Sequence, residues 1–434
     1  MTGFAAFVRD AHAAGHLVVQ PRMGFGDAER MRAGLVATRR ARATAVGTIT
    51  LDSYTRIGDY QALRVAEARG TPLNGYPLVT TDPTTTAHVL SDAVAHGFPV
   101  QVRHGSPLPG DIVTALVRLG LDATEGGPVS YCLPYGRSPL RDSVTGWRRA
   151  VEAFAAAPGE PHLESFGGCM MGQLCPPSLL VALTVLEGLF FRAHGIRSLS
   201  LSFTQQTNAE QDAEALRALH RLAADLLPDV DHHVVLYAYM GVHPRTEAGS
   251  LALLADATRL AVRGSAARLI VKTPAEAHRI PRIAENVASL EHAAATARAT
   301  SRTGPPIADT GIEAQARTLV AAVLDLHPDV GEALARAFET GVLDVPYCLH
   351  PDNANRSRAH VDGAGWLRWS SVGAMPLIPD GPPTAVTSST LLTALHHVEQ
   401  RYDRVALTAA PAPAVERRHD RLALTAAPAP AAER

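Results

Sequence analysis

The sequence of 434 residues predicts an α/β fold, a (β/α)8 barrel of the TIM type with a small C-terminal appendage and a disordered Ala/Pro-rich tail. Two observations lead to this prediction. Short β-rich runs alternate with Ala/Leu/Arg stretches at helical spacing, which indicates parallel strands joined by right-handed crossovers. About eight such units follow one another over roughly 280 residues, which is the size expected of a single barrel.

The expected strands are short and mostly apolar. Nine segments qualify for eight places, and 129–133 is the weakest because Pro128 and Pro134 flank it closely. The nine segments are 16–20, 46–51, 71–76, 99–104, 129–133, 162–166, 198–203, 232–239 and 267–272. The expected helices cover 26–41, 84–95, 110–119, 142–157, 178–194, 209–226, 248–263 and 282–298.

An open doubly wound sheet is the alternative fold. A dinucleotide site in such a sheet would need G-x-G-x-x-G directly after the first strand. Gly24 and Gly26 follow the first expected strand, but Glu29 stands where the third glycine belongs. A carboxylate there would repel a pyrophosphate, so the sequence favours the barrel.

The chain divides into three expected regions. Residues 1–302 form the catalytic barrel, 303–385 form an appendage packed on it, and 386–434 hold a helix remnant and a low-complexity tail. In the appendage, Gly341 is expected to end a helix. The tail is a tandem repeat of 17 residues, 401–417 and 418–434, whose Ala-Pro stretches favour extended, solvated chain.

Composition limits the classes of function. The net charge of −2 gives no sign of a nucleic-acid or anionic membrane partner. The four cysteines form no C-x-x-C pair, which indicates a reduced, cytoplasmic protein. The N-terminus does not resemble a signal peptide, and the most apolar window, 179–191, is too short to span a bilayer.

Polar and charged side chains gather after the expected strands. The active site of such a barrel lies at the carboxyl ends of its strands. The residues found there are Arg22, Asp52, Tyr54, Arg56, Asn74, Arg103, His104, Glu125, Tyr131, Tyr135, Lys272 and Glu276.

Three arginines at three strand ends would repel one another unless an anion lay between them. Arginine binds carboxylates in a bidentate manner, and Glu125 beside them could receive an ammonium. The set of Arg22, Arg56 and Arg103 therefore indicates a small dianion that carries an amine, such as an acidic amino acid. The alternative for each arginine is a local ion pair on the rim. Lys272 and Glu276 are either a simple ion pair in the first turn of a helix or contacts to a cofactor sugar.

Several long motifs resemble the large subunit of coenzyme-B12-dependent glutamate mutase (methylaspartate mutase). They occur in family order and span roughly residues 15–375, about as expected for one large domain. The motifs are QPRMG (20–24), TLDSYTR (50–56), LNGYP (73–77), VRHGSP (102–107), EGGPVSYCLPY (125–135), VKTPAEA (271–277) and AFETGVLDVP (337–346).

The resemblance implies an isomerase of glutamate metabolism. It implies a barrel that shares adenosylcobalamin with a separate small cobalamin-binding subunit, in a heterotetramer that contains a homodimer of this chain. A 5′-deoxyadenosyl radical would abstract hydrogen from C4 of L-glutamate, and migration of a glycyl fragment would give (2S,3S)-3-methylaspartate.

The resemblance also implies roles for individual residues. Arg22, Arg56 and Arg103 would bind the two substrate carboxylates, and Glu125 would hold the amino group. Tyr131 and Tyr135 would complete the substrate pocket. The residues that would face the cofactor are Gly24, Thr50, Asn74, His104, Pro134, Phe166, Met240, Lys272 and Glu276, the last two near its ribose. The resemblance implies no metal ligand in this chain.

The chain departs from the family pattern in places. Its segment before QPRMG is short, 167–178 is richer in Met and Cys than usual, and the Ala-Pro repeat replaces a longer C-terminal part. These departures leave two alternatives open: the same radical chemistry on a modified acidic amino acid in secondary metabolism, or a non-catalytic subunit that stabilises its partner. The complete set of arginines with Glu125 favours an enzyme.

Two further patterns are expected to have no metal role. Residues 10–15 match D-x-H-x-x-G, in which the histidine of cobalamin-binding domains holds cobalt, but here the motif precedes the first strand and predicts a surface helix. His350 near Asp352 is expected to be a loop ion pair.

Overall fold

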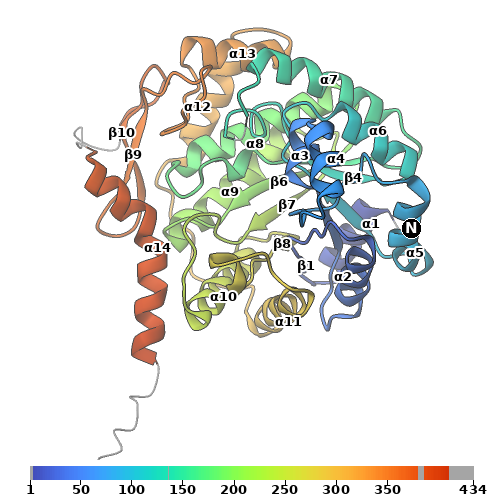
Figure 1. Ribbon diagram of the computed structural model, residues 1–434. Helices are drawn as coiled ribbons and strands as arrows, with labels where there is room; N and C mark the ends of the chain where they lie inside the picture. The colour runs from blue at the N-terminus through green and yellow to red at the C-terminus, as the bar shows by residue number, and fades with distance from the viewer. Residues whose placement is uncertain (1–2, 135, 380–385, 410–434) are drawn as a thin grey trace, which may run out of the picture.

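Eight parallel strands form a ring that outer helices surround (Figure 1). The computed structural model describes residues 3–134, 136–379 and 386–409. The strands are β1 (Val18–Gln20), β2 (Gly47–Thr50), β3 (Val100–Arg103), β4 (Ala123–Gly126), β5 (His162–Ser165), β6 (Ser198–Thr204), β7 (Asp231–Tyr237) and β8 (Arg268–Ile270). They are hydrogen-bonded in the order β1-β8-β7-β6-β5-β4-β3-β2, and the bridge between Val19 and Ala45 brings β1 next to the start of β2. The predicted TIM-type barrel is confirmed.

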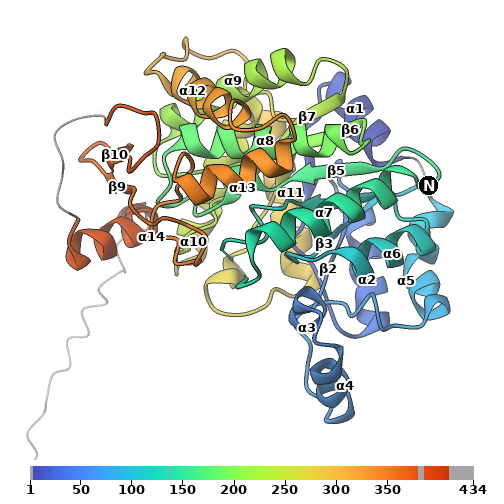
Figure 2. The same cartoon turned by 90° about the horizontal axis from the view of Figure 1, so that it is seen from above.

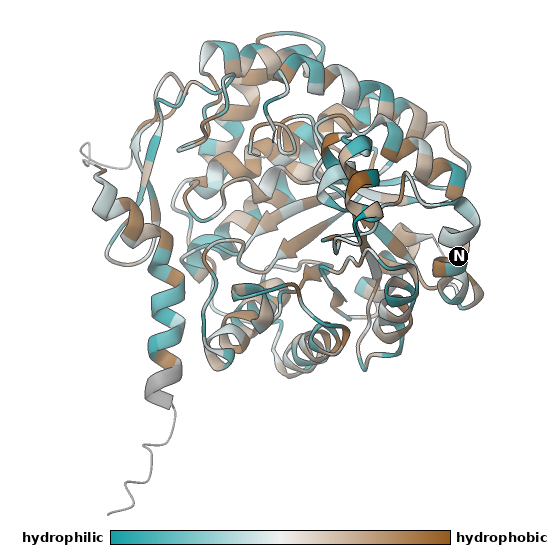
Figure 3. Ribbon diagram, in the orientation of Figure 1, coloured by the Kyte–Doolittle hydropathy of each residue, from teal (hydrophilic) through white to brown (hydrophobic). Residues whose placement is uncertain are grey.

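The eight helices expected between the strands are all present, with ends within a few residues of the predicted ones. They are α2 (Ala28–Arg40), α5 (Pro83–Ala95), α6 (Gly110–Leu119), α7 (Leu140–Ala155), α8 (Pro177–Ala193), α9 (Ala209–Leu226), α10 (Glu247–Arg263) and α11 (Ile283–Ala299). Figure 3 shows apolar residues concentrated along the central strands, while the outer helices carry polar residues as well. This distribution is the one that burial of a helix face against a barrel requires.

Two of the nine expected strands are wrong and one strand was missed. Residues 71–76 form a loop that joins the barrel through a single bridge between Leu51 and Tyr76. Residues 129–133 form turns, as the flanking prolines suggested. The missed strand is β4, whose four residues include a glutamate and a glycine and so lack an apolar pattern. Asn74 therefore follows no barrel strand, and Glu125 lies within a strand rather than after one.

The carboxyl end of the barrel carries extra segments. Helices α3 (Ser53–Ile57) and α4 (Tyr60–Ala68) follow β2 directly, and Figure 2 shows them projecting from the ring beyond the outer helices. Short 3-10 turns follow β5 and β8, namely η1 (Gly167–Cys169) and η2 (Pro274–Ala277). Asp52 caps α3 by accepting hydrogen bonds from two backbone N–H groups, so α3 begins immediately at the end of β2.

The amino end of the barrel is closed by α1 (Phe4–Ala13). Phe4 and Val8 pack with Val18, Val46, Ala123 and Ala267, which lie at the beginnings of four strands or directly before them. The D-x-H-x-x-G segment therefore belongs to a helix at the end of the barrel opposite to the candidate site. His12 is half-buried there. The predicted surface helix therefore has one face buried against the end of the barrel and is not exposed on all sides.

The C-terminal region packs beside the barrel. Helix α12 (Ile312–Leu324) and α13 (Val330–Thr340) lie against α8, and Gly341 ends α13 in the left-handed conformation with φ of 79°, as predicted. An antiparallel hairpin, β9 (Arg358–Val361) and β10 (Leu367–Ser371), precedes α14 (Ser388–Ala409). The boundaries after residues 302 and 385 stay predictions. In the described part of the chain, no helix is long and apolar enough to cross a membrane.

The first repeat copy begins as ordered helix, which corrects the prediction of a disordered tail for residues 401–409. Tyr402 donates to Asp256 over 2.7 Å, and Asp403 accepts the backbone N–H groups of Arg245 and Thr246, each over 3.0 Å. The reason is that this stretch contains no proline and continues the helical pattern of α14. The rest of the predicted tail, 410–434, lies outside the described residues.

Candidate functional site

The predicted substrate residues meet in one cavity at the carboxyl end of the barrel. The cavity has a volume of about 290 Å³. Arg22 follows β1, Arg56 lies on α3, Arg103 ends β3 and Glu125 lies in β4, so four neighbouring segments supply the charged groups. The residues that line the cavity are Arg22, Thr50, Ser53, Arg56, Ile57, Arg103, His104, Gly105, Glu125, Tyr131, Phe166 and Met240.

The three arginines have different partners. Arg103 donates from Nε to Glu125 over 2.7 Å and is almost fully buried. Arg22 donates to Glu276 over 3.0 Å, and its Nε is buried without a hydrogen-bond partner among the residues that the structure describes. Arg56 donates only to a neutral group among the described residues, the carbonyl of Leu51, at 2.9 and 3.1 Å. The local ion pairs considered as an alternative therefore exist for two arginines but not for Arg56.

Burial and positive charge act together on Arg56. Burial lowers its pKa, and the nearby Arg103 and Arg22 lower it further, while Tyr131 and Glu125 act in the opposite direction. An anion placed between these side chains would relieve this repulsion and provide Arg56 with a counterion. The geometry therefore suits a ligand that brings at least one carboxylate to Arg56.

Glu125 accepts hydrogen bonds from several directions. Its Oε2 accepts from Arg103 and from the hydroxyl of Tyr237, each over 2.7 Å, and its Oε1 accepts from the hydroxyl of Tyr131 in a very short contact. An ionised carboxylate has about four lone-pair positions. Three donors leave one position, on Oε1, for a ligand.

His104 is held neutral beside this cavity. Its pKa is lowered to about 3, because it is buried and because Arg56 and Arg103 are close. The backbone N–H of Ser106 donates to Nδ1 over 3.0 Å, so the proton of the neutral ring belongs on Nε2. Among the described residues, Nε2 is buried without a well-aligned hydrogen-bond partner, although the backbone of Glu125 is close enough to oppose the lowering of the pKa, and the ring stacks on Trp147 with centroids 5.7 Å apart. The ring therefore carries a neutral N–H group at the site.

A second hollow of about 240 Å³ adjoins the first and holds many of the predicted cofactor residues. Arg22 and Thr50 line both hollows, and the buried hydroxyl of Thr50 finds no hydrogen-bond partner in the described part of the chain. Gly24 lies so close to β2 that an added Cβ would be 2.3 Å from the carbonyl oxygen of Thr50, so packing alone requires a glycine there. Asn74 accepts the N–H of Ser53 over 2.9 Å.

Lys272 and Glu276 lie at the end of β8 beside this second hollow. Their charged groups are 3.8 Å apart, and Glu276 also accepts the backbone N–H of Thr273 as part of a capping box. Burial lowers the pKa of Lys272 to about 8, with Glu276 opposing the shift and Arg22 adding to it. The ion pair of the simpler interpretation is present, but Glu276 is shared with Arg22.

Two predicted cofactor residues, Pro134 and Lys272, line neither of the two hollows. Pro134 lies in a separate cavity of about 480 Å³ with Leu133, Arg137 and Leu349. Tyr135 lies outside the described residues. Phe166 and Met240, in contrast, both line the substrate cavity; Phe166 follows β5, which pairs with β4, and Met240 follows β7.

Three buried residues of the site were not predicted. Tyr237 in β7, Glu164 in β5 and Arg268 in β8 point into the barrel and link Glu125 to its interior. Barrel interiors are usually filled by branched apolar side chains. A charged or phenolic residue at an inward-facing strand position was the signal that could have identified them.

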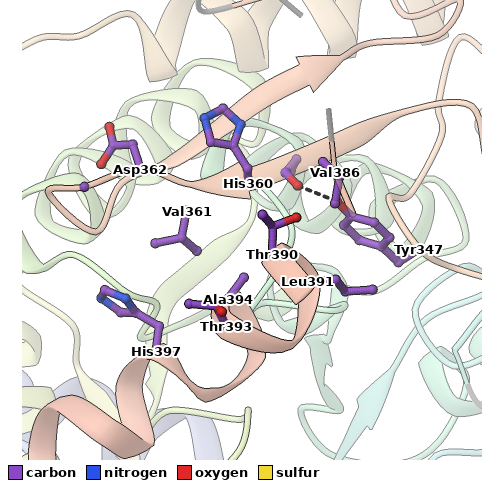
Figure 4. Close-up of a pocket in the computed structure, with 12 residues that line it drawn as sticks. Tyr347, His360, Val361, Asp362, Val386, Thr390, Leu391, Thr393, Ala394 and His397 are labelled. Atoms are coloured by element: carbon purple, nitrogen blue, oxygen red, sulfur yellow. Dashed lines mark hydrogen bonds between the residues drawn. The ribbon is translucent and has the colours of Figure 1, made fainter. Parts of the chain in front are cut away.

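A further pocket of about 390 Å³ lies away from the barrel mouth, between the β9–β10 hairpin and α14 (Figure 4). It is lined by His360 and Val361 of the hairpin and by Leu391 and His397 of α14. No described candidate residue lines it.

Elsewhere, His350 lies 3.9 Å from Asp352, and no three His, Cys, Asp or Glu side chains of the described residues are grouped to hold a metal ion.

Comparisons with known proteins agree with one another. The family described as methylaspartate mutase E chain (MutE) matches residues 1–389. The glutamate mutase epsilon subunit of Halobacterium salinarum is 30% identical over 390 residues, covering 86% of this chain and 80% of that protein. The glutamate mutase epsilon subunit of Desulfitobacterium hafniense is 31% identical over 348 residues, covering 75% of this chain and 71% of that protein.

Proposed function

This chain belongs to the methylaspartate mutase E chain family, and from that membership we propose that it is the large subunit of an adenosylcobalamin-dependent glutamate mutase. The proposed reaction interconverts L-glutamate and (2S,3S)-3-methylaspartate. The proposed assembly is a heterotetramer in which two copies of this chain each bind one small cobalamin-binding subunit.

The observation that carries the proposal is the charge arrangement of the substrate cavity. Arg56 has no carboxylate partner among the described residues, while Glu125 keeps one lone-pair position for a donor. Glutamate supplies what both groups lack, because it brings carboxylates and an ammonium in one molecule. The retention of Arg22, Arg56, Arg103 and Glu125 together favours a catalytic subunit over a purely structural one.

In this proposal, the residues of this chain position the substrate rather than perform acid–base chemistry. The arginines bind the two carboxylates, Glu125 holds the ammonium, and His104 adds a neutral N–H donor. Charge-assisted hydrogen bonds to fixed donors hold the reacting carbon in place. The apolar walls, Phe166 and Met240, exclude water from a reaction that must not meet other hydrogen donors.

The residues around the second hollow fit a large polar cofactor. Within the described parts of the chain, Arg22 Nε, Thr50 Oγ1 and His104 Nε2 are buried polar atoms without well-aligned hydrogen-bond partners, and all three lie at the two adjoining hollows. Buried polar groups without partners are rare, so they indicate a ligand. Gly24, Thr50, Asn74, His104, Lys272 and Glu276 would hold adenosylcobalamin, with the last two near its ribose. When bound, the cofactor supplies the radical that starts the rearrangement.

The test is an anaerobic assay of the reconstituted complex. This chain, a small cobalamin-binding subunit of the same family, adenosylcobalamin and L-glutamate are mixed, and 3-methylaspartate is measured by mass spectrometry. We expect product only when both subunits and the cofactor are present. The absence of product and of any change in the cobalamin spectrum, with glutamate or other acidic amino acids, would overturn the proposal.

A further inference from the structure

One phenol in the barrel interior contacts two buried carboxylates. The hydroxyl of Tyr237 lies 2.7 Å from Oε2 of Glu125 and makes a still shorter contact with Oε1 of Glu164. All three side chains are almost completely buried. Glu125 lies in β4, Glu164 in the neighbouring β5, and Tyr237 in β7, which β6 separates from β5, so the phenol reaches across the barrel interior (Figure 1 labels β4, β6 and β7).

Each carboxylate has its own arginine. Arg103 pairs with Glu125, and Arg268 pairs with Glu164 on the side of the phenol away from the cavity. Arg268 is fully buried and also donates to Ser200 over 3.0 Å and to Gln101 over 3.2 Å. Two positive and two negative charges therefore balance within a row that we call the carboxylate ladder, defined as Arg103, Glu125, Tyr237, Glu164 and Arg268.

The phenol has one proton for two acceptors. Burial raises the pKa of Tyr237 well above its usual value, so the hydroxyl keeps its proton. Burial alone would raise the pKa of Glu164, but Arg268 and the hydrogen bond from Tyr237 hold it below its usual range. Both carboxylates are therefore acceptors, and the hydroxyl can donate to only one of them at a time.

We propose that Tyr237, supported by Glu164 and Arg268, is a positioning residue that orients Glu125 for the substrate ammonium. Tyr237 and Arg103 occupy Oε2 of Glu125, which leaves Oε1 on the side of Tyr131 and the cavity. When an ammonium binds Oε1, its positive charge compensates Glu125, and the phenolic proton turns to Glu164. The inference deepens the proposed function and rests on it for the identity of the ammonium ligand.

The test compares two ligands that differ in the ammonium group. Binding of L-glutamate and of glutarate to the full chain is measured by calorimetry for the wild type, Tyr237→Phe and Tyr239→Phe. Tyr239 is the matched control, because it is buried in the segment that follows β7 and its hydroxyl has no hydrogen-bond partner among the described residues. Hydrogen bonds to charged groups are strong, so we expect Tyr237→Phe to weaken glutamate binding roughly 10- to 100-fold.

Glutarate binding separates positioning from general damage. It should change by no more than about twofold in Tyr237→Phe, and Tyr239→Phe should bind both ligands like the wild type. Equal losses for glutamate and glutarate, or no loss for either, would overturn the inference. Should Tyr237→Phe fail to fold in a thermal melt, the double variant Glu164→Leu with Arg268→Met, which leaves neither charge of that pair buried alone, replaces it, with a smaller loss expected for glutamate only.

The outcomes also distinguish this inference from the proposed function. The wild type could bind glutamate more tightly than glutarate and still yield no methylaspartate with any small subunit. That result would contradict the mutase reaction. It would still support the role of the carboxylate ladder if Tyr237→Phe no longer bound glutamate more tightly than glutarate. A wild type without any preference for glutamate would contradict the ladder, whatever the assay of turnover gave.

Discussion

The mouth and the interior of this barrel both contain buried arginine, but they differ in how its charge is balanced. In the interior, Arg268 faces the carboxylate of Glu164 and donates to three further side chains. At the mouth, Arg56 donates only to a neutral backbone carbonyl among the described residues. The interior charge is balanced within the folded protein, whereas the charge of Arg56 at the mouth has no carboxylate among the described residues and is available to a ligand. The two regions should therefore respond differently when an arginine is removed.

The largest expected effect is in the interior. Arg268→Met would leave Glu164 buried without a counterion, which should lower the free energy of unfolding by about 3–5 kcal/mol. Chemical denaturation followed by circular dichroism measures the change. The double variant Arg268→Met with Glu164→Leu removes both charges and should recover most of the loss. If Arg268→Met alone were as stable as the wild type, Arg268 would not be needed to balance the charge of Glu164.

At the mouth, the corresponding change should affect substrate use rather than stability. Arg103→Lys loses the Nε donor to Glu125 and the planar geometry that binds a carboxylate, so kcat/KM for glutamate should fall about 100-fold. Cobalamin binding, measured by its absorbance spectrum in the complex, should be nearly unchanged. Arg39→Lys, a surface arginine paired with Asp92, is the control and should retain activity. Unaffected turnover in Arg103→Lys would refute its assignment to the substrate carboxylates.

The contrast also explains what the sequence could predict. The residues at the mouth lie in long motifs, so Arg22, Arg56, Arg103 and Glu125 could be identified before their geometry was known. The helices were predictable because their apolar stripe repeats over ten or more residues. β4 was missed because four residues with an inward glutamate and a final glycine carry no period-2 pattern.

The interior network could not be predicted for a different reason. Glu164, Tyr237 and Arg268 lie in three separate strands, and two of these strands also contain other polar residues, so no single one of the three stands out in the sequence. Only the closure of the ring brings them together, since β5 and β8 are not neighbours in the sheet. Similarly, nothing in the repeat sequence indicated that Tyr402 and Asp403 would contact the N-terminal part of α10 and its cap.

One buried glutamate holds a loop at the mouth of the barrel and is expected to make the stability of the protein depend on pH. Glu187 on α8 accepts the N–H groups of Val129 and Ser130 at 3.1 and 2.8 Å, and so anchors the loop that carries Tyr131. Burial raises its pKa to about 7, although these hydrogen bonds oppose the shift. A carboxyl whose pKa is raised in the folded state stabilises the protein at low pH, and this contribution is lost as the pH rises from the unfolded pKa through 7.

The corresponding prediction concerns the pH dependence of stability. Between pH 5 and 8, the wild type should lose roughly 1–3 kcal/mol more of its free energy of unfolding than Glu187→Gln, because the amide does not ionise. Urea denaturation at several pH values measures both curves. Parallel curves for the two proteins would mean that Glu187 does not change its protonation in this range.

The smallest expected effect lies at the C-terminal helix, outside both regions. Asp403 accepts hydrogen bonds from the N–H groups of Arg245 and Thr246 and from the hydroxyl of Thr246, the N-cap residue of α10. Asp403→Ala removes these bonds where water can partly replace them, so the free energy of unfolding should fall by only about 0.5–1.5 kcal/mol. Limited proteolysis should cut α14 faster in the variant, while methylaspartate formation stays unchanged because no residue of α14 lines the substrate cavity. A loss of activity without faster cleavage would contradict this expectation. It would mean that α14 affects the mouth of the barrel, and the comparison of mouth and interior would then have to take α14 into account.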